Sequence, residues 1–248
     1  MKQQNRILLL GGSGKLGKEI IQSNLFEQIY FPTKEICDLE NKESIDSILN
    51  QYKPTHVINC AALARRKICQ TNPKGAISIN IIGTSQLVQS ILDFRTRNIE
   101  PRLLHISTDA VYHCGEGNYD EYDPTIPICN YGWTKLAAEC SVRLLNNYLI
   151  VRTRFFNPKK IPFLDAANDI FTSSIPVSRL VRLIYKLTFI EYIGVLNVGD
   201  KSQSDFDKYK KHKSDILQTD MNSITKDSSL PFCRDYTLST KRLDSISL

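Results

Sequence analysis

Short apolar runs alternate along the chain with longer stretches in which apolar residues recur every three or four positions. A continuous apolar run bounded by glycine or proline is typical of a buried strand, and the three-or-four spacing is typical of a helix with one apolar face. The pattern predicts strands over residues 6–12, 27–33, 55–62, 101–108, 148–156 and 194–200, and helices over residues 15–25, 41–52, 74–94, 131–145 and 177–187.

The predicted helix over residues 41–52 shows how local chemistry supports the pattern. Asn41 stands where an N-cap is needed, and Ile45, Ile48 and Leu49 fall on one face. Strands and helices alternate in the same way over most of the chain, and the strands are apolar throughout. This order predicts an α/β fold with a doubly wound parallel sheet that helices cover on both faces.

Composition narrows the class of protein only slightly. The 248 residues are 42% hydrophobic and 23% charged, with a net charge of +6, which is ordinary for a globular chain. The apolar runs predict no membrane span, and the N-terminus lacks the pattern of a signal peptide. The basic run KYKKHK at 208–213 is interpreted as a solvated helix face rather than a nucleic-acid patch.

Cysteine usage predicts a location and a redox state. The seven cysteines are scattered, odd in number and without a C-x-x-C pair. We therefore expect free thiols in a cytoplasmic protein, and we expect no metal site.

A glycine-rich turn between the first predicted strand and helix carries the first functional signal. Gly11, Gly14 and Gly17 form a G-x-x-G-x-x-G spacing, in which the chain can turn sharply and approach a pyrophosphate at the helix N-terminus. The stretch lacks the frame of a P-loop, because no Ser or Thr follows Lys15. The turn predicts dinucleotide binding on a Rossmann-type sheet.

The end of the second predicted strand bears on which dinucleotide binds. A carboxylate there would bond the 2′-hydroxyl of NAD. Thr33 and Lys34 follow the strand instead, and a cation could meet a 2′-phosphate, although Glu35 and Asp38 lie close by. We expect NADP(H) to be preferred, with NAD(H) as the alternative.

Tyr131 and Lys135 stand four residues apart at the start of a predicted helix. Most Tyr-x-x-x-Lys pairs are one turn of a surface helix, so the spacing alone indicates no chemistry. The surrounding motifs change that interpretation. The informative stretches are GGSGKLG at 11–17, CDLEN at 37–41, KPTHVINCAA at 53–62, INIIGTSQL at 79–87, HISTDAVY at 105–112, YDEYDPTIPICNYGWTKLAAE at 119–139, VRTRFF at 151–156 and GVLNVGD at 194–200. Through these stretches the chain resembles an extended short-chain dehydrogenase/reductase of the dTDP-4-dehydrorhamnose reductase branch over about residues 5–200.

The resemblance implies roles for individual residues. Tyr131 would be the general acid or base, Lys135 its electrostatic partner and a ribose ligand, and Thr108 the group that holds the substrate carbonyl. A neighbouring ammonium would lower the pKa of the phenol. Thr108 and Asp109 are expected to contact the substrate. The residues expected to bind the cofactor are Gly11, Ser13, Gly14, Lys15, Leu16, Gly17, Thr33, Lys34, Asp38, Leu39, Ala61, Ala62, Tyr131 and Lys135.

The resemblance also implies a domain division and an activity. Residues 1–155 would form the NAD(P)-binding Rossmann domain, and residues 156–248 a short substrate-binding region intertwined with the last sheet strands. The implied activity is NAD(P)H-dependent reduction of an NDP-4-keto-6-deoxysugar for deoxysugar and polysaccharide biosynthesis, in a possible homodimer. An NDP-sugar epimerase of the same superfamily and a non-catalytic NADP-binding regulatory subunit stay open. Dehydration is disfavoured because Ala110, rather than an acidic residue, follows Asp109.

Two features depart from the family pattern. After the NCAA of residues 59–62, the run Arg65, Arg66 and Lys67 replaces the polar and acidic residues that are usual in the family. It could contact substrate phosphates or begin an exposed helix. The stretch between RTRFF and GVLNVG is also short, which leaves the identity of the sugar open.

Overall fold

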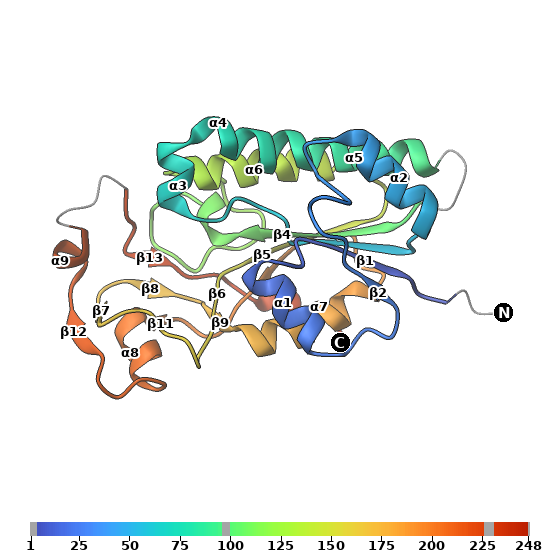
Figure 1. Ribbon diagram of the computed structural model, residues 1–248. Coiled ribbons are helices and arrows are strands. Elements are labelled where there is room, and N and C mark those ends of the chain that lie inside the picture. Colours follow the sequence, from blue (N-terminus) through green and yellow to red (C-terminus); the bar gives the residue numbers. More distant parts are fainter. Residues whose placement is uncertain (1–3, 96–99, 226–230, 248) are drawn as a thin grey trace.

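The protein is described from a computed structural model that covers residues 4–95, 100–225 and 231–247. A parallel six-stranded sheet lies at its centre (Figure 1). The strands lie in the order β2-β1-β3-β4-β5-β10. The chain first adds β2 on one side of β1 and then adds β3 and the later strands on the other side, as in a doubly wound sheet. The α/β fold expected from the sequence is thus confirmed. The strands are β1 (Ile7–Leu10), β2 (Ile29–Tyr30), β3 (His56–Asn59), β4 (Arg102–Thr108), β5 (Tyr148–Thr153) and β10 (Gly194–Val198).

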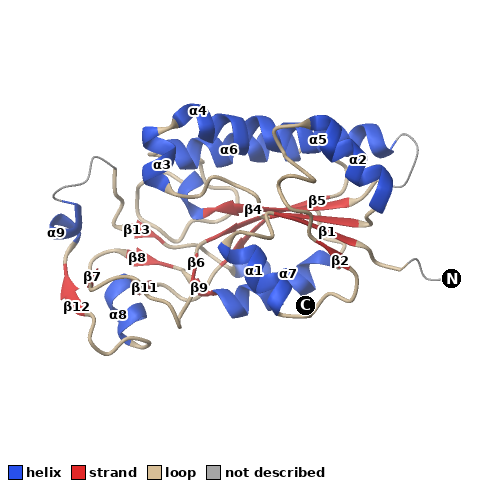
Figure 2. Cartoon of the chain, viewed as in Figure 1, coloured by secondary structure: helices blue, strands red, loops and turns tan. Residues whose placement is uncertain are grey.

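Two helical layers cover the sheet (Figures 1 and 2). Successive residues of β1 supply both layers, because side chains alternate along a strand. Ile7 and Leu9 pack in one buried cluster, and Leu8 and Leu10 pack in the other. The first cluster lies under α1 (Lys15–Gln22), α7 (Val177–Thr188) and α10 (Lys241–Asp244); the second lies under α2 (Lys42–Tyr52), α5 (Gly83–Arg95) and α6 (Asn130–Val142).

Local chemistry explains where the helices begin. The side chain of Asn41 accepts a hydrogen bond from the Ser44 amide at 3.3 Å, which confirms it as the N-cap of α2. Asn72 caps the next long helix in the same way, with Pro73 in the first turn. That helix runs without a break through α4 (Pro73–Ala76), the π-helical η1 (Ile77–Ile82) and α5, after the short α3 (Arg66–Thr71).

The stretch Pro73–Arg95 is long and apolar enough to span a membrane by length and composition alone. Its packing gives it another role, since Leu87, Val88 and Ile91 are buried against sheet residues such as Val57 and Leu103. We therefore describe it as a core helix of the α/β fold.

The second predicted strand is shorter than expected. The pattern predicted residues 27–33, but only Ile29–Tyr30 pair with β1. Pro32 has no amide hydrogen to continue the ladder, so the chain leaves the sheet before it.

Residues after β5 build small elements beyond the carboxyl ends of the strands, on the left of Figure 1. They also return to the sheet, because β10 is its edge strand beside β5. The small elements are β6 (Phe155–Phe156), β7 (Asp165–Ala167), β8 (Phe171–Thr172), β9 (Ile175–Pro176), β11 (Gln203–Ser204), α8 (Asp205–Lys210), β12 (Leu217–Thr219), α9 (Met221–Thr225) and β13 (Asp235–Tyr236). The short helix η2 (Asp109–Val111) comes earlier in the chain, directly after β4.

The interpretation of residues 208–213 as a solvated face is wrong at Lys208. Its side chain is 1% exposed, and its ammonium is paired with Asp205 and donates to the Thr172 hydroxyl at 3.0 Å. Lys210 and Lys211 are exposed as expected. The charge pattern could not show this, because Thr172 comes from a distant strand.

Candidate functional site

A cleft of about 640 Å³ opens at the carboxyl ends of β1, β2 and β3. The glycine turn forms its floor. Gly11 has a φ of +81°, and a Cβ there would collide with the backbone of Ala61. A Cβ on Gly17 would collide with the carbonyl of Gly11. Both positions therefore require glycine, which lets the first turn of α1 approach the turn closely.

Most of the residues expected to bind the cofactor line the cleft. Lys15, Leu16 and Gly17 are not part of this lining and form the first turn of α1, where Leu16 and Gly17 are buried. The sequence analysis did not single out Glu40 or Cys60, which also line the cleft. The expected residues in its lining are Gly11, Ser13, Gly14, Thr33, Lys34, Asp38, Leu39, Ala61 and Ala62.

At the cleft edge after β2, two carboxylates form ion pairs with Lys34. The Lys34 ammonium lies 3.1 Å from a Glu40 carboxylate oxygen and 3.5 Å from Asp38. The hydrogen bond to Glu40, followed by the charge of Asp38, raises the pKa of Lys34. The Ser78 hydroxyl also donates to Glu40 and, together with Lys34, lowers the pKa of that carboxyl. A 2′-phosphate would have to compete with two carboxylates for this lysine.

The expected catalytic hydroxyls meet beside the end of β4. Thr108 is the last residue of that strand, and Tyr131 lies in the first turn of α6. The Thr108 hydroxyl interacts with the Tyr131 phenol and lowers the pKa of that phenol. The Thr108 hydroxyl also donates to Asp109 Oδ1 at 3.1 Å and accepts from the Ala110 amide at 3.2 Å. The structure thus brings this expected pair together.

The expected pKa shift of Tyr131 has the opposite sign in the structure. Burial, the largest effect, raises the pKa of the phenol, and the hydrogen bond from Thr108 offsets this only in part. Lys135, which was expected to lower the pKa of the phenol, contacts another side chain instead. Its Nζ lies 3.0 Å from His105 Nε2, and both side chains are buried. His105 stands inside the HISTDAVY motif, but nothing in the spacing pointed to this contact.

The structure gives Asp109 a partner that the sequence analysis missed. Arg154, which follows β5, donates from Nε to Asp109 Oδ2 at 2.5 Å and from Nη2 to Oδ1 at 3.2 Å. The guanidinium also lies 4.5 Å from the centre of the Tyr236 ring. Asp109 is 2% exposed. The carboxylate expected to face a sugar is thus held by protein groups on both oxygens.

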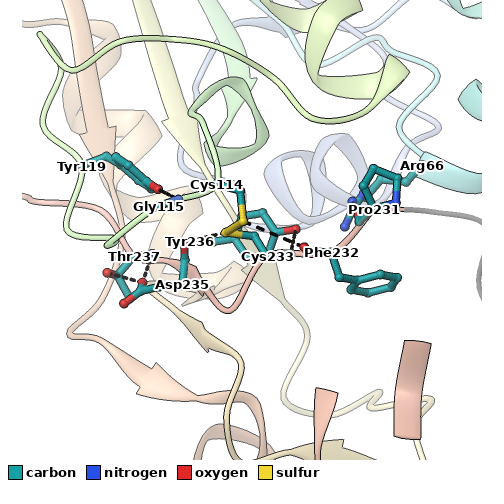
Figure 3. Close-up of a disulfide and its surroundings, with 10 residues drawn as sticks. All are labelled: Arg66, Cys114, Gly115, Tyr119, Pro231, Phe232, Cys233, Asp235, Tyr236 and Thr237. Carbon is teal, nitrogen blue, oxygen red and sulfur yellow. Dashed lines mark hydrogen bonds between the residues drawn. A yellow bond between two sulfur atoms is a disulfide. The ribbon is translucent and has the colours of Figure 1, made fainter. Parts of the chain in front are cut away.

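A disulfide joins the loop after η2 to the C-terminal segment (Figure 3). It links Cys114 to Cys233, with their Cα atoms 5.3 Å apart. The expectation that all seven cysteines are free thiols is therefore wrong for these two. Their separation of 119 residues explains the error, because pairing over such a distance depends on the fold. The free cysteines are Cys37, Cys60, Cys69, Cys129 and Cys140.

Arg66 contacts the same C-terminal segment (Figure 3). Its guanidinium donates to the carbonyl of Pro231 at 2.5 Å and lies 5.2 Å from the centre of the Phe232 ring. The basic run noted in the sequence thus contacts the C-terminal segment. This contact gives Arg66 a structural role.

Comparison with known proteins places these features in a family. The family model described as the RmlD substrate binding domain matches residues 5–160, which is more than half of the chain. The chain belongs to the RmlD family. The resemblance to dTDP-4-dehydrorhamnose reductases, drawn from the motifs, is confirmed.

The RmlD relatives are moderately similar in sequence. The chain is 29% identical over 154 residues to the dTDP-4-dehydrorhamnose reductase of Aggregatibacter actinomycetemcomitans, covering 60% of this chain and 50% of that protein. It is 32% identical over 154 residues to the dTDP-4-keto-6-deoxy-D-glucose reductase of Streptomyces niveus, covering 60% and 52%. It is also 30% identical over 152 residues to methionine adenosyltransferase 2 subunit beta of Rattus norvegicus, covering 57% and 43%. The chain spans about half the length of the curated relatives it matches.

Solved structures share the fold over nearly the whole chain. The dTDP-4-dehydrorhamnose reductase of Bacillus anthracis, in complex with NADP, superposes with a TM-score of 0.85 at 24% identity, covering 100% of this chain and 94% of that one. The UDP-glucose 4-epimerase of Thermus thermophilus, complexed with NAD, gives a TM-score of 0.78 at 16% identity, covering 97% and 92%. At these identities the likeness establishes the fold.

Proposed function

We propose that this RmlD-family protein is an NAD(P)H-dependent reductase of an NDP-4-keto-6-deoxysugar. The observation that carries the proposal is the contact of the Thr108 hydroxyl with the Tyr131 phenol at the end of β4. Lys135 stands one helical turn further along α6, and the glycine-turn cleft opens at the same end of the sheet.

The cleft suits a dinucleotide on structural grounds. Its glycine turn excludes side chains where a pyrophosphate would lie, and α1 presents its N-terminus there. When bound, the reduced nicotinamide supplies the hydride. The Thr108 hydroxyl would turn from Asp109 to donate to the keto oxygen, and Tyr131 would deliver a proton to that oxygen. Because burial raises the pKa of Tyr131, the phenol keeps its proton at neutral pH, as a general acid for reduction must.

We propose NADP(H) as the preferred cofactor and NAD(H) as the alternative. Thr33 and Lys34 line the cleft where a 2′-phosphate would reach, whereas Glu40 and Asp38 oppose it. The preference then depends on whether the phosphate can displace Lys34 from its two carboxylates.

A non-catalytic NADP-binding subunit is the second candidate. The closed Asp109–Arg154 pair favours it, because the carboxylate expected to recognise the sugar is already satisfied. The similarity to methionine adenosyltransferase 2 subunit beta supports the same alternative.

One experiment separates these functions from the epimerase alternative. The protein is mixed with NADPH, or in parallel NADH, and a panel of NDP-4-keto-6-deoxysugars, and the absorbance of the reduced nicotinamide is followed. A reductase consumes the reduced cofactor with one sugar of the panel. An epimerase changes its sugar without net consumption, and a binding subunit shows nucleotide affinity without turnover. Either of these two results would overturn the proposed reductase.

A further inference from the structure

His105 and Lys135 form a buried polar pair beneath the candidate active site. His105 lies in β4, three residues before Thr108, and is fully buried. Lys135 lies in α6 and is 2% exposed. Their nitrogens, Nε2 and Nζ, are 3.0 Å apart, which is hydrogen-bonding distance.

Asn59 fixes the proton on the other side of the imidazole. Its Oδ1 accepts from the Ala61 amide at 3.0 Å, so its NH₂ group faces His105. Asn59 Nδ2 lies 3.3 Å from His105 Nδ1, across the pairing of β3 with β4. An amide NH₂ can only donate, so Nδ1 acts as the acceptor. In a neutral imidazole the single ring proton is then on Nε2 and points at Lys135.

That arrangement conflicts with a charged lysine. An ammonium carries three donors and no acceptor, so it cannot bind an N–H group. Two arrangements remain. A neutral Lys135 amine can accept from Nε2–H while the Asn59 bond is kept. A charged Lys135 can donate to a bare Nε2, but the ring proton must then move to Nδ1, and the bond from Asn59 is lost.

The charges around Lys135 allow both arrangements near neutral pH. Burial, the largest effect, lowers its pKa to about 8, although Glu139 and Cys60 act in the other direction. Glu139 is held by Arg152 at 2.7 Å and by the Ser107 hydroxyl at 2.5 Å, so its carboxylate is engaged elsewhere. Burial raises the pKa of Cys60 to about 12, which keeps it a neutral thiol.

The imidazole itself stays uncharged. Burial and the charge of Lys135 lower the pKa of His105 well below its ordinary value. Protonation in this pair therefore falls on the lysine, and the ring can respond only by moving its own proton between its two nitrogens.

We propose that His105 is a positioning residue whose tautomer changes in step with the protonation of Lys135. The imidazole offers an acceptor when Lys135 is charged and a donor when Lys135 is neutral. Lys135 is thereby held in one place in both of its protonation states. The consequence for catalysis rests on the proposed reductase function, but the coupling itself belongs to the folded protein.

The coupling is tested without substrate or cofactor. The ¹⁵N spectrum of the protein labelled in its four histidines reports which ring nitrogen bears the proton. His105 is assigned from the signals missing in His105→Gln. We expect its proton on Nδ1 at low pH and on Nε2 at high pH, with a midpoint near the pKa of Lys135. In Lys135→Met, the proton should stay on Nε2 throughout, because Asn59 alone then decides.

A His105 tautomer that does not change with pH in the wild-type protein would overturn the proposal. So would a tautomer change that persists in Lys135→Met. Since neither result depends on turnover, failure of the coupling is distinguishable from failure of the proposed reductase.

Kinetics provide the second readout. In His105→Leu the buried ammonium loses its acceptor, so the alkaline limb of the activity profile should move down by about one pH unit or more. His105→Gln keeps an amide that can turn either its oxygen or its NH₂ group to Lys135, and should restore the limb toward its original pH. Equal displacement in both variants would indicate a merely structural role and would contradict the proposal.

Discussion

Arg154 holds Asp109 by both carboxylate oxygens, and Thr108 donates to one of the same oxygens. This joins the residue expected to recognise substrate to the residue expected to hold the reacting carbonyl. The pair also connects two neighbouring strands of the sheet, since Asp109 follows β4 and Arg154 follows β5.

Arg154→Met should destabilise the protein because it leaves the Asp109 carboxylate buried without a partner. We expect a loss of about 2–4 kcal/mol in the free energy of unfolding, measured with urea. Arg179→Met is the matched control, because Arg179 also pairs with an aspartate, Asp200, but is 60% exposed. This change should lower the free energy of unfolding by less than about 1 kcal/mol. Equal losses in the two variants would show that the Asp109 pair does not depend on burial.

Tyr131→Phe should abolish most turnover while cofactor binding is kept. The change removes the hydroxyl that donates the proton, and we expect turnover to fall roughly 10²–10⁴-fold in stopped-flow or steady-state assays of nicotinamide absorbance. Tyr122→Phe is the control, since that ring is 85% exposed. Near wild-type turnover in Tyr131→Phe would remove the phenol from the mechanism.

The pH profile should assign the alkaline limb of activity to Lys135. Burial raises the pKa of Tyr131, so the phenol stays protonated while Lys135, whose pKa is lowered to about 8, loses its proton first. Activity in the reductive direction should therefore be constant on the neutral side and fall as pH rises through about 8. The control is the pH dependence of unfolding, which separates the limb from loss of structure. A limb that begins only well above pH 9 would argue for the phenol instead.

Glu40→Gln should shift cofactor preference toward NADPH. The change frees Lys34 from one of its two carboxylates, and the freed ammonium can meet a 2′-phosphate. We expect the affinity ratio of NADPH to NADH to rise by about 2–10-fold in fluorescence titrations, and added salt to reduce the gain. Glu43→Gln removes a neighbouring exposed carboxylate outside the cleft and should leave the ratio unchanged. An unchanged ratio in Glu40→Gln would mean that Lys34 does not reach the phosphate.

Reduction of the Cys114–Cys233 disulfide should loosen the C-terminal segment. A cross-link that closes a loop of this length contributes about 2–5 kcal/mol to stability in the chain-entropy account. We expect urea unfolding of the wild type to shift when reductant is added, and Cys114→Ser to unfold at the reduced position with or without it. Cys140→Ser, which removes an exposed free thiol, should keep the response to reductant. Thiol titration under denaturing conditions without reductant should find five free cysteines rather than seven.

The sequence predicted what depends on neighbours along the chain. Apolar runs located the strands, and Asn41 located the start of α2, because caps and periodicity act within one turn of backbone. The glycine turn was predictable in part for the same reason, since Gly14 and Gly17 meet Gly11 within the turn, whereas the contact of Gly11 with Ala61 joins distant segments.

Contacts between distant segments could not be read in this way. Arg154 meets Asp109 only because β4 and β5 are neighbours in the sheet, and Lys135 turns to His105 only because α6 packs over β4. The pKa of Tyr131 was predicted with the wrong sign because burial, which the spacing cannot show, outweighs nearby charge. The residue types of the candidate site were thus predictable, whereas their electrostatic pairing was not.

The position of β10 limits how this architecture can be varied. The edge strand β10 and the helix α7 lie in the sequence between the small elements β9 and β11. The helix α10, which packs in the same buried cluster, follows the last small element, β13. A cut near residue 155 would therefore leave an N-terminal part that lacks some of its own core. The small elements lie outside the six-stranded sheet, so their length can change without altering its register. If these elements bind the substrate, as proposed, changes in their length are expected to alter substrate choice without disturbing the six-stranded sheet.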